Sequence, residues 1–105
     1  MLQSPTVSGY SFCLYVGPSD RSRAAETNLR AVCEARLPSG FRLEIVDAAQ
    51  EPGRAEEQRI LATPTVVRLA PLPQRRVIGD LSNHRRAADA LGLPDEPPEL
   101  VRDQR

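Results

Sequence analysis

The sequence predicts an α/β fold in which a mixed four-stranded sheet is covered by helices on both faces. Short runs rich in β-branched and aromatic residues alternate with apolar stripes at helical spacing, which indicates strands and helices in turn. A tight connection at residues 71–73 (PLP) joins the last two strand-like runs and predicts an antiparallel hairpin. A chain of 105 residues has room for one domain with a single core.

The first strand is expected at residues 10–16 (YSFCLYV). Apolar side chains fall on both of its faces, with Phe12 and Leu14 on one face and Cys13 and Tyr15 on the other. A strand that is apolar on both faces is typical of the centre of a sheet with helices on each side.

A long helix is expected next, with Ser19 as its N-cap and residues 38–40 (PSG) as its end. Its apolar residues recur on one stripe, and charged residues occupy the outer side. The stripe consists of Ala25, Leu29, Val32, Cys33 and Leu37. A second strand at residues 41–47 (FRLEIVD) completes a βαβ unit, whose strands run parallel with a right-handed crossover.

The second half of the domain is expected to contain a short helix, two strands and a last helix. The short helix is placed at residues 54–61, with Pro52 as an alternative first residue, and the strands at 65–69 and 75–79. The last helix begins at a cap formed by Asp80 or Ser82 and runs to Leu91.

Gly92 is a typical C-terminal stop for that helix, so the folded domain is expected to cover residues 10–93. The segments on either side, residues 1–9 and 94–105, are polar and contain prolines. We expect a flexible tail at residues 1–9 and a disordered tail at residues 94–105.

The order βαβαββα is the thioredoxin-like layout. Proteins with this layout usually have a cis proline just before the third strand, and Pro64 occupies that position. An X–Pro bond loses only about 0.5–1 kcal/mol in the cis form, so tertiary contacts can impose it. We therefore expect a cis bond at Pro64, with a trans proline that opens the strand as the alternative.

The turn at which a thiol redox enzyme of this layout keeps its CxxC motif holds no cysteine here. It reads GPSDRS at residues 17–22, at the start of the long helix, where a thiolate would be stabilised. Cys13 and Cys33 are expected in the core. His84, the only histidine, has no carboxylate or nucleophile placed to serve it and is expected to face solvent. The sequence therefore predicts no catalytic residue, no cofactor site and no metal site.

The charges balance to a formal net charge of +0, and all 14 basic residues are arginines. This balance argues against sequence-independent nucleic-acid binding, and no apolar run is long enough for a membrane span, so a cytoplasmic protein is expected. Residues 44–57 carry five acids against one arginine, and residues 68–86 carry five arginines against one acid. This polarity indicates either solvated faces or a protein partner with complementary patches.

Three blocks of sequence carry a resemblance to a known family. They are LYV at residues 14–16, the pair Glu56-Glu57 ahead of ILATPT at 60–65, and RRVIGDLS at 75–82. Across residues 10–93 the chain closely resembles the KaiB family of bacterial clock proteins. It departs from typical members in a shorter turn after the first strand and in Pro71-Leu72-Pro73, where three prolines are usual. It therefore resembles a divergent paralogue.

The resemblance implies a non-enzymatic regulator that binds a KaiC-like ATPase. It also implies a KaiA-like protein or a sensor kinase as further partners. The alternative is a KaiB-like sensor or adaptor domain that acts in signalling or a stress response through another protein partner. A thiol oxidoreductase is disfavoured because the CxxC motif is missing.

The resemblance also implies two accessible folds. In one the chain is thioredoxin-like, monomeric and able to bind the ATPase; in the other the second half is rebuilt and tetramers form. Residues 83–92 (NHRRAADALG) contain strong helix formers and no β-branched residue. We therefore expect the thioredoxin-like monomer, with the tetrameric fold as the alternative.

Two groups of residues are the candidates for these functions. The switch region is expected at Pro71, Pro73, Gly79 and Asp80, and partner binding at Arg75, Arg76 and Ser82. The alternatives are a strand-end role for Gly79 and ordinary solvated charge for the two arginines.

Overall fold

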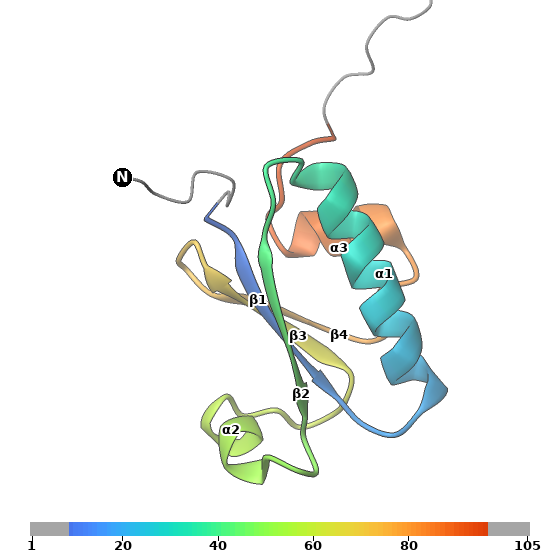
Figure 1. Ribbon diagram of the computed structural model, residues 1–105, viewed down its shortest axis with the longest axis vertical. Helices are drawn as coiled ribbons and strands as arrows, with labels where there is room; N and C mark the ends of the chain where they lie inside the picture. The colour runs from blue at the N-terminus through green and yellow to red at the C-terminus, as the bar shows by residue number, and fades with distance from the viewer. Residues whose placement is uncertain (1–8, 97–105) are drawn as a thin grey trace, which may run out of the picture.

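The computed structural model describes residues 9–96 and has the element order predicted from the sequence (Figure 1). Most of the two expected tails, residues 1–8 and 97–105, lies outside the described part of the chain. The elements are β1 (Ser11–Val16), α1 (Asp20–Arg36), β2 (Arg42–Asp47), α2 (Pro52–Glu57), β3 (Thr65–Ala70), β4 (Arg75–Ile78) and α3 (His84–Ala90). No helix within residues 9–96 is long and apolar enough to cross a membrane.

The four strands form one mixed sheet in the order β2-β1-β3-β4. β1 runs parallel to β2 and antiparallel to β3, and β3 and β4 form the predicted antiparallel hairpin. This arrangement confirms the βαβ unit and the thioredoxin-like fold class. It also leaves β2 and β4 as the two edges of the sheet.

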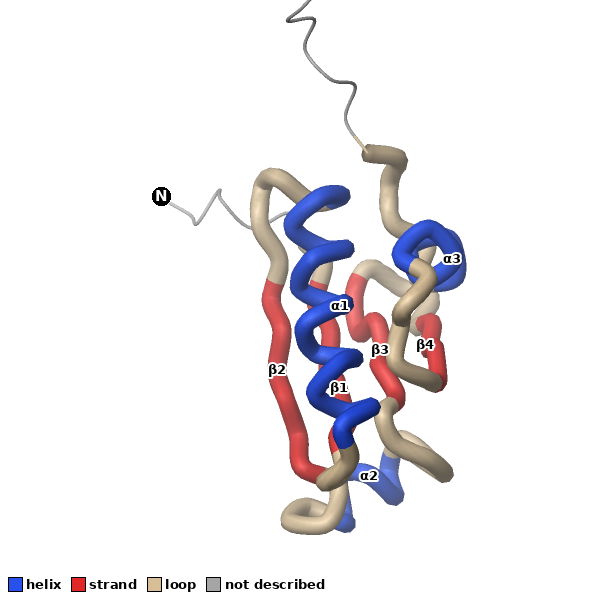
Figure 2. Tube along the Cα trace, turned by 90° about the vertical axis from the view of Figure 1, so that its right-hand side faces the viewer, coloured by secondary structure: helices blue, strands red, loops and turns tan. Residues whose placement is uncertain are grey.

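The main core lies between the sheet and the pair α1 and α3, which cover the same face (Figure 2). Phe12 and Leu14 of β1 pack there with the buried stripe of α1 and with Leu91. All five residues of the predicted stripe are buried, because a 3.6-residue repeat keeps them on one side of the helix.

A smaller core lies on the opposite face, where Cys13 and Tyr15 of β1 pack with Val46, Val67 and Ala55 of α2. The central strand is therefore covered on both faces, as predicted. α2 has only six residues and lies at the lower end of the sheet in Figure 1.

α2 is shorter than predicted, because it ends at Glu57 rather than at Leu61. Arg59 takes a left-handed conformation with φ 56°, and its N–H donates to the carbonyl of Glu56 at 2.9 Å. The N–H of Ile60 reaches back to the carbonyl of Ala55 at 2.9 Å. This pair of bonds is a Schellman motif, which normally uses glycine at the left-handed position. An arginine there gives no sequence signal for the helix end.

The cap of α3 also differs from the prediction, because Asn83 takes the role assigned to Asp80 or Ser82. The Asn83 side chain accepts a hydrogen bond of 3.0 Å from the N–H of Arg86. Asp80 instead accepts the N–H of Ser82 at 3.0 Å within the preceding loop. The predicted end is correct, since Gly92 has φ 67° and the N–H of Leu93 reaches the carbonyl of Ala88 at 2.9 Å.

Three strand ends are one residue shorter than predicted, at Tyr10, Phe41 and Gly79. The ladder still continues past two strand ends, because the N–H of Arg42 donates to the carbonyl of Tyr10 and that of Gly79 to Pro64, both at 2.9 Å. Gly79 has φ 122°, a conformation that turns the chain out of β4.

Candidate interaction site

The turn between β1 and α1 contains hydroxyl groups where a redox enzyme would hold thiols. The Ser19 side chain caps α1 by accepting the N–H of Ser22 at 3.3 Å, as predicted. The Ser22 hydroxyl accepts the N–H of Gly17 at 2.9 Å. Both hydroxyl groups therefore serve the local backbone, and the turn offers no redox-active pair.

The two cysteines are free, buried and on opposite faces of the sheet. Burial raises the pKa of Cys33 to about 12 and also raises the pKa of Cys13. A thiol is unreactive when its thiolate is so disfavoured, so these cysteines are core residues, as expected. Residues 9–96 contain no group of three or more His, Cys, Asp or Glu side chains that could hold a metal ion.

His84 is the first residue of α3 and is exposed. Its Nε2 lies 2.9 Å from Oδ1 of Asn28 on α1. The ring therefore joins the two helices at the surface and contacts no carboxylate or nucleophile that the structure shows.

Arg75 and Arg76 point to opposite faces of β4, as neighbouring residues of a strand do. Arg75 lies against Gly92 at the end of α3. Arg76 reaches the other face and donates to the carbonyl of Gln58 at 2.7 Å. Both side chains are exposed, and the structure does not bring them together as one patch.

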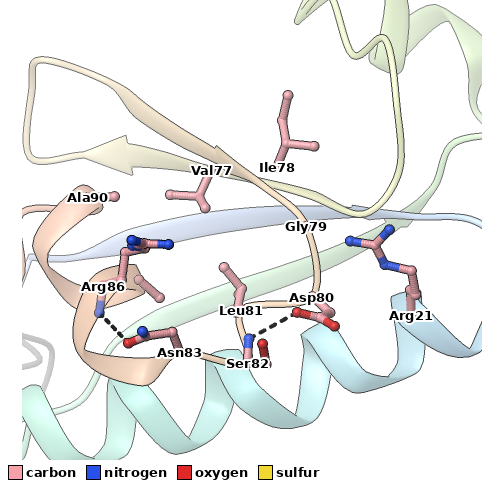
Figure 3. A pocket seen from close by; sticks show the side chains of 11 residues that line it. Arg21, Val77, Ile78, Gly79, Asp80, Leu81, Ser82, Asn83, Arg86 and Ala90 are labelled. Atoms are coloured by element: carbon pink, nitrogen blue, oxygen red, sulfur yellow. Dashed lines mark hydrogen bonds between the residues drawn. The ribbon is translucent and has the colours of Figure 1, made fainter.

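A hollow of about 300 Å³ opens beside β4, between the start of α1 and α3 (Figure 3). Val77, Leu81, Ala87 and Ala90 give it an apolar lining, and Arg21 and Arg86 stand on either side of it. Three of the expected residues, Gly79, Asp80 and Ser82, also line it. The backbone N–H of Ser82 and the charge of Arg21 are among the causes that lower the pKa of Asp80, so this carboxylate remains ionised.

The remaining expected residues lie at the two ends of the β3–β4 hairpin. Pro64 is fully buried at the start of β3, and the Thr63–Pro64 bond is cis. Pro71 and Pro73 are exposed in the hairpin turn at the other end, and both follow cis bonds. Gly79 joins Pro64 through its backbone hydrogen bond, so only one end of the hairpin lies beside the hollow.

Arg68 corrects the charge pattern inferred from the sequence. Its place in the sequence puts it in the positive segment 68–86, but its residue exposure is only 4%. Its guanidinium donates to the carbonyl oxygens of Leu91 at 2.9 Å and Pro73 at 2.8 Å and lies 5.9 Å from the ring centre of Tyr10. Its Nε has no partner in residues 9–96. This arginine is therefore part of the packing beneath α3 and adds little to the surface charge.

The sequence did not single out Arg21 or Arg86, and it included Ile78 only as part of the block at residues 75–82. Ile78 is 63% exposed although it is a large apolar residue in a strand. The exposure of Ile78 could have been predicted from the sequence. The fourth strand of a βαβαββα sheet lies at an edge, where an isoleucine has no neighbouring strand to cover it.

Comparison with known proteins assigns the chain to a family. A family model described as KaiB domain matches residues 13–93, which is most of the chain. The chain belongs to the KaiB family. The resemblance seen in the ILATPT and RRVIGDLS blocks is thus confirmed over nearly the whole domain.

Curated relatives of this KaiB-family chain are circadian clock proteins. Circadian clock protein KaiB3 of a Synechocystis species is 38% identical over 84 residues, covering 79% of this chain and 82% of the relative. Circadian clock oscillator protein KaiB of Prochlorococcus marinus is 40% identical over 85 residues, covering 80% of this chain and 73% of the relative.

Solved structures show which fold this KaiB-family chain has. The N-terminal domain of SasA from Synechococcus elongatus has a TM-score of 0.66 at 19% identity, covering 85% of this chain and 82% of that domain. Mitochondrial thioredoxin 3 of Saccharomyces cerevisiae has a TM-score of 0.64 at 17% identity, covering 80% and 77% of the two chains. Both support the thioredoxin-like fold.

Proposed function

We propose that this chain is a non-enzymatic clock-type regulator that binds a KaiC-like ATPase through its thioredoxin-like state. The observation that carries the proposal is a KaiB-family chain in a thioredoxin-like arrangement whose β1–α1 turn holds serines instead of cysteines. The chain has the fold of a redox protein without the reactive cysteine pair, so we look for its function in binding through its surface.

The local structure of α3 supports the thioredoxin-like state as the major one. Asn83 caps the helix, a Schellman motif closes it at Gly92, and Arg68 bonds its C-terminal carbonyl group. Backbone NMR shifts of residues 84–91 test this state, and helical values are expected. Strand values there, or a tetramer by light scattering, would contradict it.

The face of the sheet beside α2 is our candidate for the ATPase contact. Leu61 is 93% exposed in the loop that precedes β3, and Arg76 is held next to that loop by its bond to Gln58. An apolar side chain beside an arginine suits an interface with an apolar centre and an acidic rim. Arg75 and Ser82 lie outside this face and are secondary candidates.

A pull-down with the KaiC homologue from the same cell, incubated with ATP for several hours, tests the proposal. Wild-type protein should retain the ATPase, and Arg76→Ala should weaken binding about fivefold, as expected for the loss of roughly 1 kcal/mol of rim charge. Arg30→Ala, an exposed change on the outer side of α1, is the matched control. No binding by the wild-type chain would overturn the proposal.

Two further partner classes can be tested in the same assay. A KaiA-like protein should join the complex, and a sensor kinase should be displaced from the ATPase when this chain is added. If the ATPase does not bind but a signalling protein does, the adaptor function replaces the regulator function.

A further inference from the structure

The outer edge of β4 presents backbone groups that no strand within residues 9–96 covers. The N–H of Gly79 bonds to Pro64, and hydrogen-bonded pairs alternate along an antiparallel ladder. Val77 therefore bonds inward to Val66, whereas Arg76 and Ile78 direct their N–H and C=O groups away from β3. No backbone group from another element bonds to these two residues within residues 9–96. An edge of this kind can pair with an added strand.

The hollow lies directly beside this edge. Val77 and Ile78 belong to both features, and Ala87 and Ala90 of α3 extend the apolar lining (Figure 3). A strand added to β4 would place alternate side chains toward the helix-covered face of the sheet. One of those side chains would therefore enter the hollow.

The charges around the edge select the kind of strand that fits. Arg21 and Arg86 stand beside the hollow, and neither forms a salt bridge within residues 9–96. Arg75 and Arg76 are exposed on opposite faces of β4 and do not line the hollow, where Asp80 is the one acidic residue among residues 9–96. Two arginines against one aspartate around the hollow favour acidic side chains on the incoming segment.

The same charges disfavour a second copy of this chain at the edge. Pairing of β4 with its own copy would bring Arg75 and Arg76 of one molecule toward the arginines of the other. Like charges placed opposite each other destabilise a strand pair. Charged residues on an exposed strand are also a common protection against self-association.

We propose that the β4 edge and its hollow bind an extended acidic segment of a protein partner by strand addition. An apolar side chain of that segment occupies the hollow, and acidic side chains two positions before and after it, which point to the same face, bond Arg21 and Arg86. This site is distinct from the sheet face of Leu61 and Arg76, and it does not depend on the proposed ATPase partner.

The test uses a pool of short acetylated peptides with valine or leucine at the centre and aspartate or glutamate two positions to either side of it, so that all three side chains share one face. A matched pool carries lysine at the acidic positions. Amide shifts of the protein are followed by NMR as each pool is added. The acidic pool should move the amides of Arg76, Ile78 and the loop at residues 79–82, and high salt should weaken the effect.

Reversing the charge of the two arginines separates a loss of binding from a loss of folding, because a folded variant should gain affinity for one pool as it loses affinity for the other. The double variant Arg21→Glu and Arg86→Glu should lose about tenfold in affinity for the acidic pool and gain affinity for the lysine pool. The control Arg30→Glu, on the outer side of α1, should leave both affinities unchanged.

Ile78→Pro removes an N–H that points away from β3, so the ladder should survive while peptide binding is lost. Equal binding of both pools, or shifts confined to other surfaces, would overturn the proposal. Concentration-dependent shifts at β4 without peptide would assign the edge to a second copy and would also overturn it. Failure of the ATPase pull-down leaves this test unaffected.

Discussion

The guanidinium of Arg68 on β3 donates a hydrogen bond of 2.9 Å to the carbonyl oxygen of Leu91, the C-cap residue of α3. A second nitrogen of the same group donates to the carbonyl of Pro73 at 2.8 Å. One buried side chain therefore joins the last helix to the turn of the β3–β4 hairpin. The carbonyl groups at the C-terminal end of a helix lack intrahelical partners and carry partial negative charge, which favours a cation there.

Replacing Arg68 by methionine should lower the free energy of unfolding by about 2–3 kcal/mol, because buried carbonyl groups lose their donor. Urea denaturation followed by circular dichroism measures the change. Arg30→Met on the exposed side of α1 is the control and should change stability by less than about 0.5 kcal/mol. Equal stability of the two variants would show that the Arg68 bonds contribute nothing net.

Gly92 makes the position of that guanidinium possible. A Cβ at Gly92 would lie 2.8 Å from Nη1 of Arg68, and the residue has φ 67°. Gly92→Ala should therefore cost about 1–2 kcal/mol from the left-handed backbone alone, with a further loss as Arg68 is displaced.

Gly53→Ala is the matched control for that change. Gly53 lies in α2 with open space around its Cβ position, so alanine there should be neutral or stabilise by up to about 1 kcal/mol. Thermal unfolding of both variants gives the comparison, and a Gly92→Ala protein as stable as Gly53→Ala would contradict the argument.

The sequence was sufficient for the order of elements and insufficient for Arg68. Apolar periodicity identifies β1 and α1 because their buried residues are set by local geometry. Arg68 follows two valines in β3 and reads as a surface charge, because the carbonyl groups it bonds lie five and more residues away along the chain. Only the folded arrangement of α3 over the hairpin shows why a charge is buried there.

The part of the candidate site that comes from one stretch of sequence was predictable, and the part that comes from separate helices was not. The RRVIGDLS block indicated where to look, and six of its residues line the hollow, from Val77 to Ser82. Arg21 and Arg86 come from two helices, and nothing in a linear sequence states that these helices meet beside β4. Strand parity does separate Arg75 from Arg76, so their opposite directions could have been inferred from the sequence.

The cap of α3 gives a test that distinguishes two adjacent residues. Asn83→Ala should cost about 1 kcal/mol, because the N–H of Arg86 loses its acceptor. Ser82→Ala should leave stability within about 0.5 kcal/mol, because its side chain caps nothing that the structure shows. The two variants are compared by urea denaturation, and a larger loss for Ser82→Ala would return the cap to Ser82, one of the two residues predicted from the sequence.

The Glu44 carboxylate should titrate below its usual range. Arg54 donates to it through Nη2 at 2.8 Å, and this hydrogen bond is the main cause that lowers its pKa. A depressed carboxylate pKa contributes stability that is present above the unfolded value and is lost as pH falls through the folded value. NMR titration of the Glu44 side chain should show the low midpoint in wild type.

Arg54→Met should return the midpoint of Glu44 to the ordinary range of a glutamate. Arg42→Met is the control, because Arg42 lies in β2, the same edge strand as Glu44. The pair lies at the surface, so high salt should reduce the shift in wild type as well. A midpoint that does not respond to Arg54→Met would assign the shift to another cause.

The buried cysteines predict a specific response to thiol reagents and to alkaline pH. The thiolate is the reactive species, and burial raises the pKa of Cys33 from the ordinary 9.0 to about 12. Labelling at pH 8 should therefore follow transient unfolding and speed up with mild urea, whereas Ser39→Cys in an exposed turn should add one thiol that reacts at once.

The raised pKa of Cys33 also predicts how the stability of the protein depends on alkaline pH. The unfolded chain releases the proton of the Cys33 thiol near pH 9 while the folded chain keeps it, so the free energy of unfolding should fall as pH rises from 9 toward 12. Cys33→Ala should reduce that alkaline loss. Rapid labelling of both native cysteines at pH 8 without urea would contradict their burial, and reduction of insulin by the wild-type protein would contradict the prediction that the chain is not a thiol oxidoreductase.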